Sequence, residues 1–178
     1  INDVYSAHAQ NQGAVLYDFV KGSYSLAQKL LDRYPKLLIE GCSGGGGRFD
    51  AGMLYYTPQI WCSDNTDPID RLTIQYGTSF GYPCSTVGAH VAASPCEVTS
   101  RKTPLSTRAI VAEAGTFGYE LDLGKLPEEA LASLEAQMRW HRRVEELVRT
   151  GRYHRLSSPL CDPVCAWSHV AVDGSKVL

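Results

Sequence analysis

The 178 residues of this chain are enough for one domain with a sizeable core, or for part of a larger protein. Hydrophobic residues make up 44% and charged residues 20%, a globular composition that excludes a disordered chain. The net charge of −2 argues against a dedicated nucleic-acid binder, and the sequence has no apolar run long enough to cross a membrane.

Both ends of the sequence lack the usual features of a complete chain. The first residue is Ile1, and no basic and apolar leader follows it, which indicates no signal peptide in this sequence. Residues 173–178 are typical of a turn followed by the start of a strand. We therefore expect a fragment of a longer protein.

The N-terminal third alternates helical and strand-like patterns. Apolar residues recur at helical spacing over 13–34, and Pro35 ends this predicted helix. The apolar run 37–39 predicts a strand that is buried on both faces. A second strand is expected over 59–64, and Pro68 is suited to the first position of the helix that follows.

The alternation continues through the middle of the chain. A third strand is expected near 85–91, a helix from Pro104 onward, and a fourth strand over 117–123. The clearest helix begins near Pro127 and ends at Gly151, because its first turn is acidic and one side is apolar. The basic residues late in this helix and just beyond it favour a solvated face over a nucleic-acid patch. They are Arg139, Arg142, Arg143, Arg149, Arg152 and Arg155.

After Tyr153 the pattern changes to short strand-like runs such as 166–172, which indicates the opening of an all-β domain. Four strand–helix units predict an α/β fold, with residues 1–151 forming the C-terminal half of a (β/α)8 TIM barrel. Residues 152–178 would begin the next domain. A doubly wound sheet is the alternative.

The six cysteines include no C-x-x-C pair. Cys161 and Cys165 lie four positions apart and lack the second ligand pair that a zinc site needs, so we predict no metal and no cofactor. A reduced, cytoplasmic protein is the expectation.

A run of glycines at 44–47 follows the first predicted strand and lets the backbone turn sharply near a ligand. A P-loop would need Gly-Lys-Ser/Thr at its end, but Arg48 and Phe49 follow. The dinucleotide fingerprint also fails, because the glycines are contiguous. A flexible turn remains the alternative to a binding loop.

Asp64 and Asp67 follow an apolar run that ends in Trp61. A carboxyl group beside an indole is expected to be partly desolvated, which favours its neutral form and lets it donate a proton near neutral pH. Trp61 could offer a flat apolar face to a sugar ring. The alternatives are a helix cap for Asp67 and an ordinary polar loop residue for Asp64. His90 could also reach a pocket, but a structural imidazole is favoured.

Two motifs in order resemble glycoside hydrolase family 36, the microbial α-galactosidases. Residues 39–50, Ile-Glu-Gly-Cys-Ser-Gly-Gly-Gly-Gly-Arg-Phe-Asp, are similar to the family's cysteine–glycine–arginine motif. Residues 61–67, together with Arg71, match its Ser-Asp-x-x-Asp-x-x-x-Arg motif. Segments 88–91 and 118–123 are also similar to family segments, so the resemblance covers nearly the whole chain.

This resemblance implies a (β/α)8 barrel followed by a C-terminal β-sandwich, and retaining hydrolysis of terminal α-galactosides such as melibiose and raffinose. It implies Asp64 as the general acid/base. The implied substrate-binding residues are Cys42, Ser43, Gly44, Gly45, Arg48 and Trp61. Asp50, Asp67 and Arg71 are expected to be structural residues near the site, Asp50 and Arg71 as ion-pair partners. The expected partners are α-galactoside oligosaccharides and further copies of the full-length protein, with no nucleic acid or membrane.

The second catalytic carboxylate is not evident in this sequence. The family's nucleophile is an aspartate in a Lys-Trp-Asp segment on an earlier strand, and no Lys-Trp-Asp occurs here. Glu40 is the nearest substitute and is interpreted as a core acid or one that supports the site. We therefore expect this chain alone to hold half an active site. Two rivals remain open: a non-catalytic sugar-binding relative, and an enzyme that binds phosphorylated substrates through the glycines.

Overall fold

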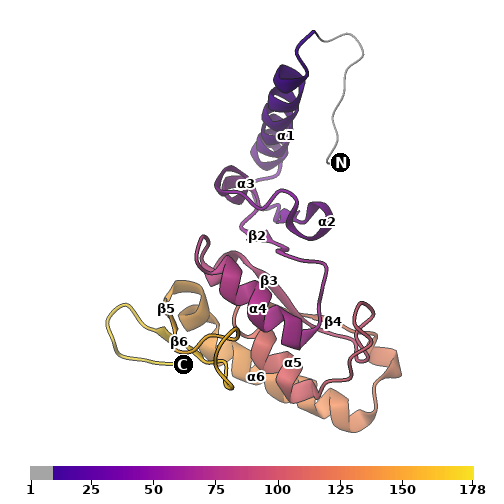
Figure 1. Ribbon diagram of the computed structural model, residues 1–178, viewed down its shortest axis with the longest axis vertical. Helices are drawn as coiled ribbons and strands as arrows, with labels where there is room; N and C mark the ends of the chain where they lie inside the picture. Colours follow the sequence, from indigo (N-terminus) through magenta and orange to yellow (C-terminus); the bar gives the residue numbers. More distant parts are fainter. Residues whose placement is uncertain (1–9) are drawn as a thin grey trace.

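The structure is a computed structural model that describes residues 10–178; expectations about Ile1 and the first residues of the 1–151 segment lie outside that range. Helix α1 (Gln12–Arg33) extends from one end of the molecule, and α6 (Glu128–Thr150) lies at the other (Figure 1). The Asn11 side chain caps α1, because its oxygen accepts hydrogen bonds from the backbone amides of Gly13 and Ala14 at 3.0 and 3.3 Å. The helix predicted over 13–34 is confirmed.

Four short parallel strands form the centre of the chain. They are β1 (Glu40–Gly41), β2 (Gln59–Ile60), β3 (Gly88–Ala92) and β4 (Thr116–Glu120). β1 pairs with β2 and β3 pairs with β4, and a parallel bridge between Ile60 and Val87 joins the two pairs. The strands therefore lie in chain order, and their carboxyl ends meet at one edge. The α/β prediction is confirmed.

A helical segment follows each of these strands. The segments are α2 (Ser43–Gly46) and α3 (Ala51–Tyr56) after β1, α4 (Pro68–Thr78) after β2, α5 (Leu105–Ala112) after β3 and α6 after β4. Short 3-10 turns, η1 (Cys84–Thr86) and η2 (Leu123–Lys125), precede β3 and follow β4. No helix within residues 10–178 is long and apolar enough to cross a membrane.

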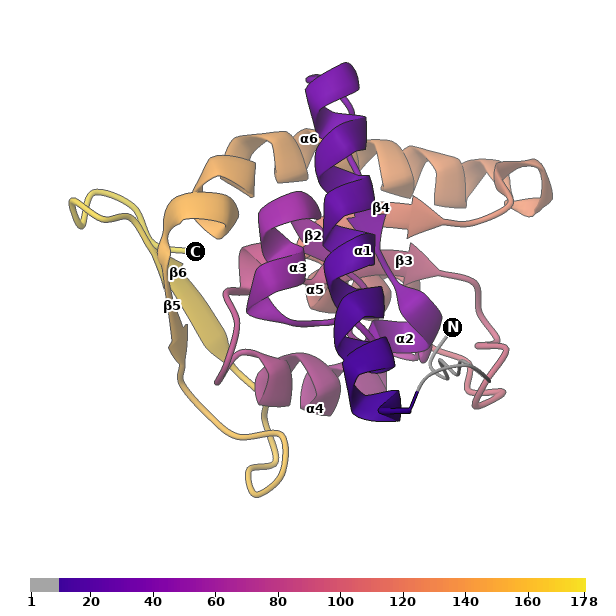
Figure 2. The ribbon, with the colours of Figure 1, turned by 90° about the horizontal axis from the view of Figure 1, so that it is seen from above.

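The core lies where α4 and α5 pack together and α5 covers β3. Ile60, Val87 and Val91 are almost fully buried there. The Gln75 amide of α4 donates a hydrogen bond of 3.0 Å to the Val111 carbonyl of α5, which ties the two helices together. A buried polar group with a partner of this kind fixes how neighbouring helices pack. The view in Figure 2 shows α6 running past β4 on the side away from α4.

The strand predicted at 37–39 is wrong in place and in burial. Pairing begins only at Glu40, and Leu37 and Leu38 are 40% and 84% exposed. An apolar run is buried on both faces only when elements cover both sides. Within residues 10–178, β1 pairs with β2 alone, and Leu38 is left largely exposed to solvent.

The chain changes from parallel to antiparallel pairing after Gly151. Strand β5 (Arg152–Arg155) pairs with β6 (Trp167–Val170) as an antiparallel hairpin, which confirms a strand within the predicted run 166–172. The last residue returns to this hairpin, because the amide and carbonyl of Leu178 pair with those of His169 at 2.9 and 3.0 Å. The hairpin lies beside the end of α6 in both views (Figures 1 and 2).

His169 makes the stability of this hairpin sensitive to pH. Its side chain is 1% exposed, neither ring nitrogen has a hydrogen-bond partner among the described residues, and the Tyr153 ring lies 5.2 Å away. Burial lowers the pKa of His169 below its ordinary value. The unfolded chain then binds the additional proton, so stability falls as pH drops through about 6.5 towards the folded-state pKa.

We expect His169→Phe to remove this part of the pH dependence in the complete gene product. The measurement is the urea midpoint at several pH values between 5.5 and 7.5, roughly the range over which an unperturbed histidine titrates. His154→Phe, at an exposed position on β5, is the matched control and should behave as wild type. An unchanged pH dependence in His169→Phe would contradict the assignment.

Candidate active site

A cleft with a volume of about 370 Å³ opens at the edge where the carboxyl ends of the four strands meet. Residues on or directly after every strand line it. They are Glu40, Cys42, Trp61, Asp64, Thr66, His90, Tyr119 and Glu120. Active sites of parallel α/β folds form at this edge, because the loops that leave the strands converge there.

The glycine run forms a left-handed turn at the rim of the cleft. The φ angles of Ser43, Gly44, Gly45 and Gly46 are 60°, 67°, 65° and 99°. A left-handed turn costs roughly 1–2 kcal/mol for each residue that carries a Cβ, which is why glycine fills three of the four positions. The sharp turn predicted from the glycines is confirmed. Cys42, immediately before it, is exposed on the cleft.

Gly45 packs directly against the backbone of Asp64. A Cβ added at residue 45 would lie 2.5 Å from the Asp64 amide nitrogen and 3.0 Å from its Cγ. Real Cβ atoms do not approach backbone this closely, so the turn and Asp64 fit together only with glycine at 45. The two family motifs, residues 39–50 and 61–67, are therefore in direct contact through Gly45 and Asp64.

Gly45→Ala should shift Asp64 as well as strain the turn. We expect a drop of about 10²-fold in kcat/KM of the complete gene product, the scale of loss that a misplacement of about 1 Å causes in an active site. The measurement is steady-state kinetics with raffinose, a substrate that the resemblance to family 36 implies. Gly77→Ala in α4 is the control, since a Cβ there meets no atom within 4 Å. Wild-type kinetics for Gly45→Ala would show that the contact does not fix Asp64.

Asp64 itself lines the cleft with an exposed side chain. The expectation that the neighbouring indole would desolvate its carboxyl group is therefore wrong within the described part of the chain. The Trp61 ring packs elsewhere: the His90 ring meets it edge-on at 4.5 Å, and a Cβ at Gly88 would lie 3.3 Å from its Cδ2.

His90 lines the cleft as well as supporting the indole, so it reaches the pocket. Burial lowers the pKa of His90, and the nearby carboxylates Glu120 and Glu40 raise it by less than burial lowers it. The neutral form of the imidazole is therefore favoured relative to a free histidine. Gly118, its register partner on β4, makes room for the ring, since a Cβ there would lie 2.7 Å from His90 Cδ2.

Asp67 is fully buried and caps α4, as the helix-cap interpretation predicts. Its carboxylate accepts hydrogen bonds from the amides of Ile69 and Asp70 at 2.8 and 3.3 Å. It also accepts from the Thr99 hydroxyl and forms an ion pair with Arg101. Burial raises the pKa of Asp67, but these hydrogen bonds outweigh burial and hold the pKa below its usual value. The carboxylate thereby ties the loop after β3 to α4.

Asp50 and Arg71 do not form the expected ion pairs among the described residues. Asp50 caps α3 and accepts a hydrogen bond of 2.8 Å from the Tyr24 hydroxyl. Arg71 is 3% exposed, and its guanidinium donates across to the Gly88 carbonyl on β3. Arg71 therefore connects α4 to the backbone of β3. The positive charge that pairs with the buried Asp67 comes from Arg101.

The predicted site residues thus separate into two groups. Cys42, Trp61 and Asp64 line the cleft. The other predicted binding residues, Ser43, Gly44, Gly45 and Arg48, are not part of its lining. The guanidinium carbon of Arg48 lies 5.8 Å from the Phe19 ring on α1. Sequence reasoning missed three further lining residues, Thr66, Tyr119 and Glu120. The available signal for Tyr119 and Glu120 was their position at the end of the fourth predicted strand.

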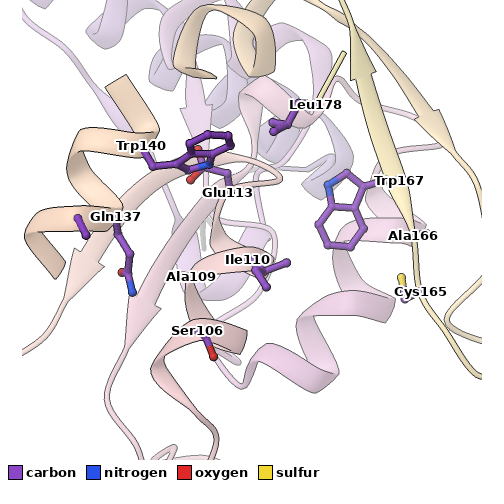
Figure 3. A pocket seen from close by; sticks show the side chains of 11 residues that line it. Ser106, Ala109, Ile110, Glu113, Gln137, Trp140, Cys165, Ala166, Trp167 and Leu178 are labelled. Atoms are coloured by element: carbon purple, nitrogen blue, oxygen red, sulfur yellow. The ribbon is translucent and has the colours of Figure 1, made fainter. Parts of the chain in front are cut away.

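A larger cavity of about 620 Å³ lies between α5, α6 and β6 (Figure 3). Trp140 and Trp167 flank it, and its one carboxylate, Glu113, is held by Nδ1 of His141 at 2.6 Å. Within residues 10–178, no group of three or more His, Cys, Asp or Glu side chains is placed to hold a metal ion. The cleft at the strand ends, which has three carboxylates, is therefore the candidate active site.

The structure is an α/β domain with a cleft at the carboxyl ends of its parallel strands, which is where the active sites of α/β enzymes lie. The sequence profile of the Melibiase family matches residues 1–151. The chain belongs to the Melibiase family.

Individual relatives agree with this membership. The chain is 51% identical over 176 residues to the bifunctional α-galactosidase/sucrose kinase AgaSK of Mediterraneibacter gnavus, covering 99% of this chain and 18% of that protein. It superimposes with TM-score 0.93 and 42% identity on a family 36 α-galactosidase, a Geobacillus stearothermophilus AgaA variant in complex with raffinose, covering 99% and 25% of the two chains. For another AgaA variant, in complex with stachyose, the TM-score is 0.91, the identity 43% and the coverage 97% and 24%. The resemblance to family 36 is confirmed, and the chain spans about a quarter or less of these relatives.

Proposed function

We propose that this chain supplies the general acid/base half of a retaining α-galactosidase active site, with Asp64 as the acid/base. The observation that carries the proposal is the cleft at the strand ends, which both Asp64 and Trp61 line and in which the glycine turn packs against the Asp64 backbone. The relatives named α-galactosidases, and the AgaA complexes with raffinose and stachyose, support the reaction and the substrate class.

The proposed chemistry begins with Asp64 protonated. The acid donates its proton to the glycosidic oxygen as the bond to the anomeric carbon breaks, and a second carboxylate about 5–5.5 Å away attacks that carbon. Asp64 then removes a proton from the water that releases galactose, which returns the acid to its starting state. The open, solvent-accessible position of Asp64 suits both steps, because the leaving group departs and water enters on that side.

Trp61, Cys42 and the residues of the glycine turn would bind the sugar. The indole offers an apolar face for the pyranose ring. The Ser43 hydroxyl is buried in the turn and has no hydrogen-bond partner among the described residues. Gly44 and Gly45 lie in the same turn, both with left-handed φ angles.

The nucleophile is proposed to come from outside these 178 residues, since the sequence has no Lys-Trp-Asp. Glu40 is unsuited to the task, because one carboxylate oxygen accepts from Trp61 Nε1 and the other from the Gln59 amide. We also propose that residues 1–151 belong to a (β/α)8 barrel and 152–178 to the start of a β-sandwich. The chain-order parallel strands and the antiparallel hairpin after Gly151 support this division.

The six cysteines are all free, which supports a reducing, cytoplasmic setting. Homo-oligomerisation of the complete protein is part of the same proposal.

The test compares the isolated chain with the complete gene product. We expect the complete gene product to release galactose from raffinose and melibiose, and the 178-residue chain alone to release none. Galactose binding without release by the complete gene product would instead indicate a non-catalytic sugar-binding relative. Protection of the protein from thermal unfolding by phosphate rather than galactose would favour the phosphorylated-substrate alternative.

A further inference from the structure

The Trp61 indole is held on several sides. Its Nε1–H donates a hydrogen bond of 2.9 Å to Glu40 Oε1, and the His90 ring meets it edge-on with an interplanar angle of 85°. The guanidinium carbon of Arg71 lies 5.6 Å from the ring centroid, and Gly88 leaves just enough room for the ring. A side chain with this many directed contacts has one preferred orientation.

Glu40 is the one carboxylate in this arrangement that is bonded to the indole. It lies opposite Gln59 in the β1–β2 register, and Trp61 follows Gln59 by two residues, so the three side chains share one face of the strands. The Gln59 amide occupies the other Glu40 oxygen. Both carboxylate oxygens of Glu40 therefore accept hydrogen bonds from neighbouring side chains. Asp64 differs, because its side chain is exposed and lines the open cleft.

We propose that Glu40 is a positioning residue that sets the plane of the Trp61 indole against which the sugar ring packs. His90 is the opposing support. The inference rests on the proposed function for its substrate. It goes further because it assigns a role to Glu40, a carboxylate that is neither the acid/base nor the nucleophile. Because Glu40 acts through the indole, removing it weakens sugar binding in ground state and transition state alike, which raises KM and leaves kcat nearly unchanged.

The first test is Glu40→Ala in the complete gene product, with raffinose as substrate. Loss of one charge-assisted hydrogen bond predicts a rise in KM of about tenfold with kcat changed by less than about threefold. Glu40→Gln should restore most of the wild-type KM, since its amide oxygen still accepts from the indole and its NH2 group can donate to Gln59 after that amide turns over. Glu146→Ala, an exposed carboxylate on α6, is the control.

A double-mutant cycle with Trp61→Phe shows whether Glu40 acts through the indole. Phenylalanine has no N–H to donate, so Glu40→Ala should change KM by less than about twofold in that background. Additive effects of the two substitutions would overturn the proposal. So would a loss of kcat in Glu40→Gln as severe as in Glu40→Ala, which would indicate a direct chemical role.

A crystal structure of the Glu40→Ala protein tests the same inference without turnover. We expect the indole to leave its wild-type orientation, and an unmoved indole would overturn the proposal. Wild-type protein that fails to hydrolyse any α-galactoside would contradict the proposed function alone, while this structure would still decide the role of Glu40.

Discussion

Replacing Asp64 by Asn in the complete gene product should lower kcat/KM for raffinose and melibiose by about 10²–10⁴-fold, the usual contribution of a positioned general acid or base. Asparagine has nearly the same shape and cannot donate the proton that the departing sugar oxygen needs. The loss therefore reports chemistry and not a change in packing at the exposed Asp64 side chain.

An activated aryl α-galactoside provides the internal comparison for Asp64→Asn. Its leaving group needs little protonation, so the first step should be much less affected than with a disaccharide, and the second step should become rate-limiting. Pre-steady-state kinetics should therefore show a burst of phenol. Asp162→Asn, in the loop between β5 and β6, is the control and should be wild type. Near wild-type turnover of melibiose by Asp64→Asn would refute the acid role.

Asp67→Ala should cause the largest loss of stability of any substitution near the cleft. It removes a fully buried carboxylate that caps α4, accepts from Thr99 and pairs with Arg101. The cap alone is worth about 1 kcal/mol, and the amides and hydroxyl left without a partner add to that cost, so we expect a loss of about 3 kcal/mol. Urea unfolding of the complete gene product at pH 7 measures it.

Asp67→Asn separates the charge from the hydrogen bonds. The pKa of Asp67 is lowered in the folded state, so its contribution is present above the unfolded pKa of about 3.9 and is lost as pH falls towards the folded value. The amide still caps α4 but loses the Arg101 ion pair, so its stability should lie between wild type and Asp67→Ala. Glu146→Ala is the control. A loss of less than about 1 kcal/mol in Asp67→Ala would contradict the structural role.

The sequence predicted well what depends on local chemistry. The cap at Asp67, the left-handed turn at the glycines and the long helix ending at Gly151 each follow from the residues within one turn, and the structure contains all three. The family motifs also placed Asp64 and Trp61 together, and the cleft contains both.

The failures have one physical cause, which is that they depend on contacts far along the chain. Leu38 is exposed because burial requires covering elements that no local pattern reveals. Arg71, which was expected in an ion pair, donates instead to the carbonyl of Gly88, seventeen residues away, and the ion pair that does form joins Arg101 to Asp67. The sequence did not predict Glu120 as a cleft residue. A residue at the end of a strand can be assigned to the cleft only when the order of the strands in the sheet is known.

Chemical rescue of Asp64→Ala by azide tests the central claim most directly. With an activated aryl α-galactoside, the variant should accumulate a galactosyl intermediate, and azide should attack its anomeric carbon in the space that the missing carboxylate leaves. We expect faster turnover and α-galactosyl azide, the anomer that a retaining enzyme without its acid/base produces. Formation of β-galactosyl azide would identify Asp64 as the nucleophile, and no rescue at all would contradict an acid/base role for Asp64.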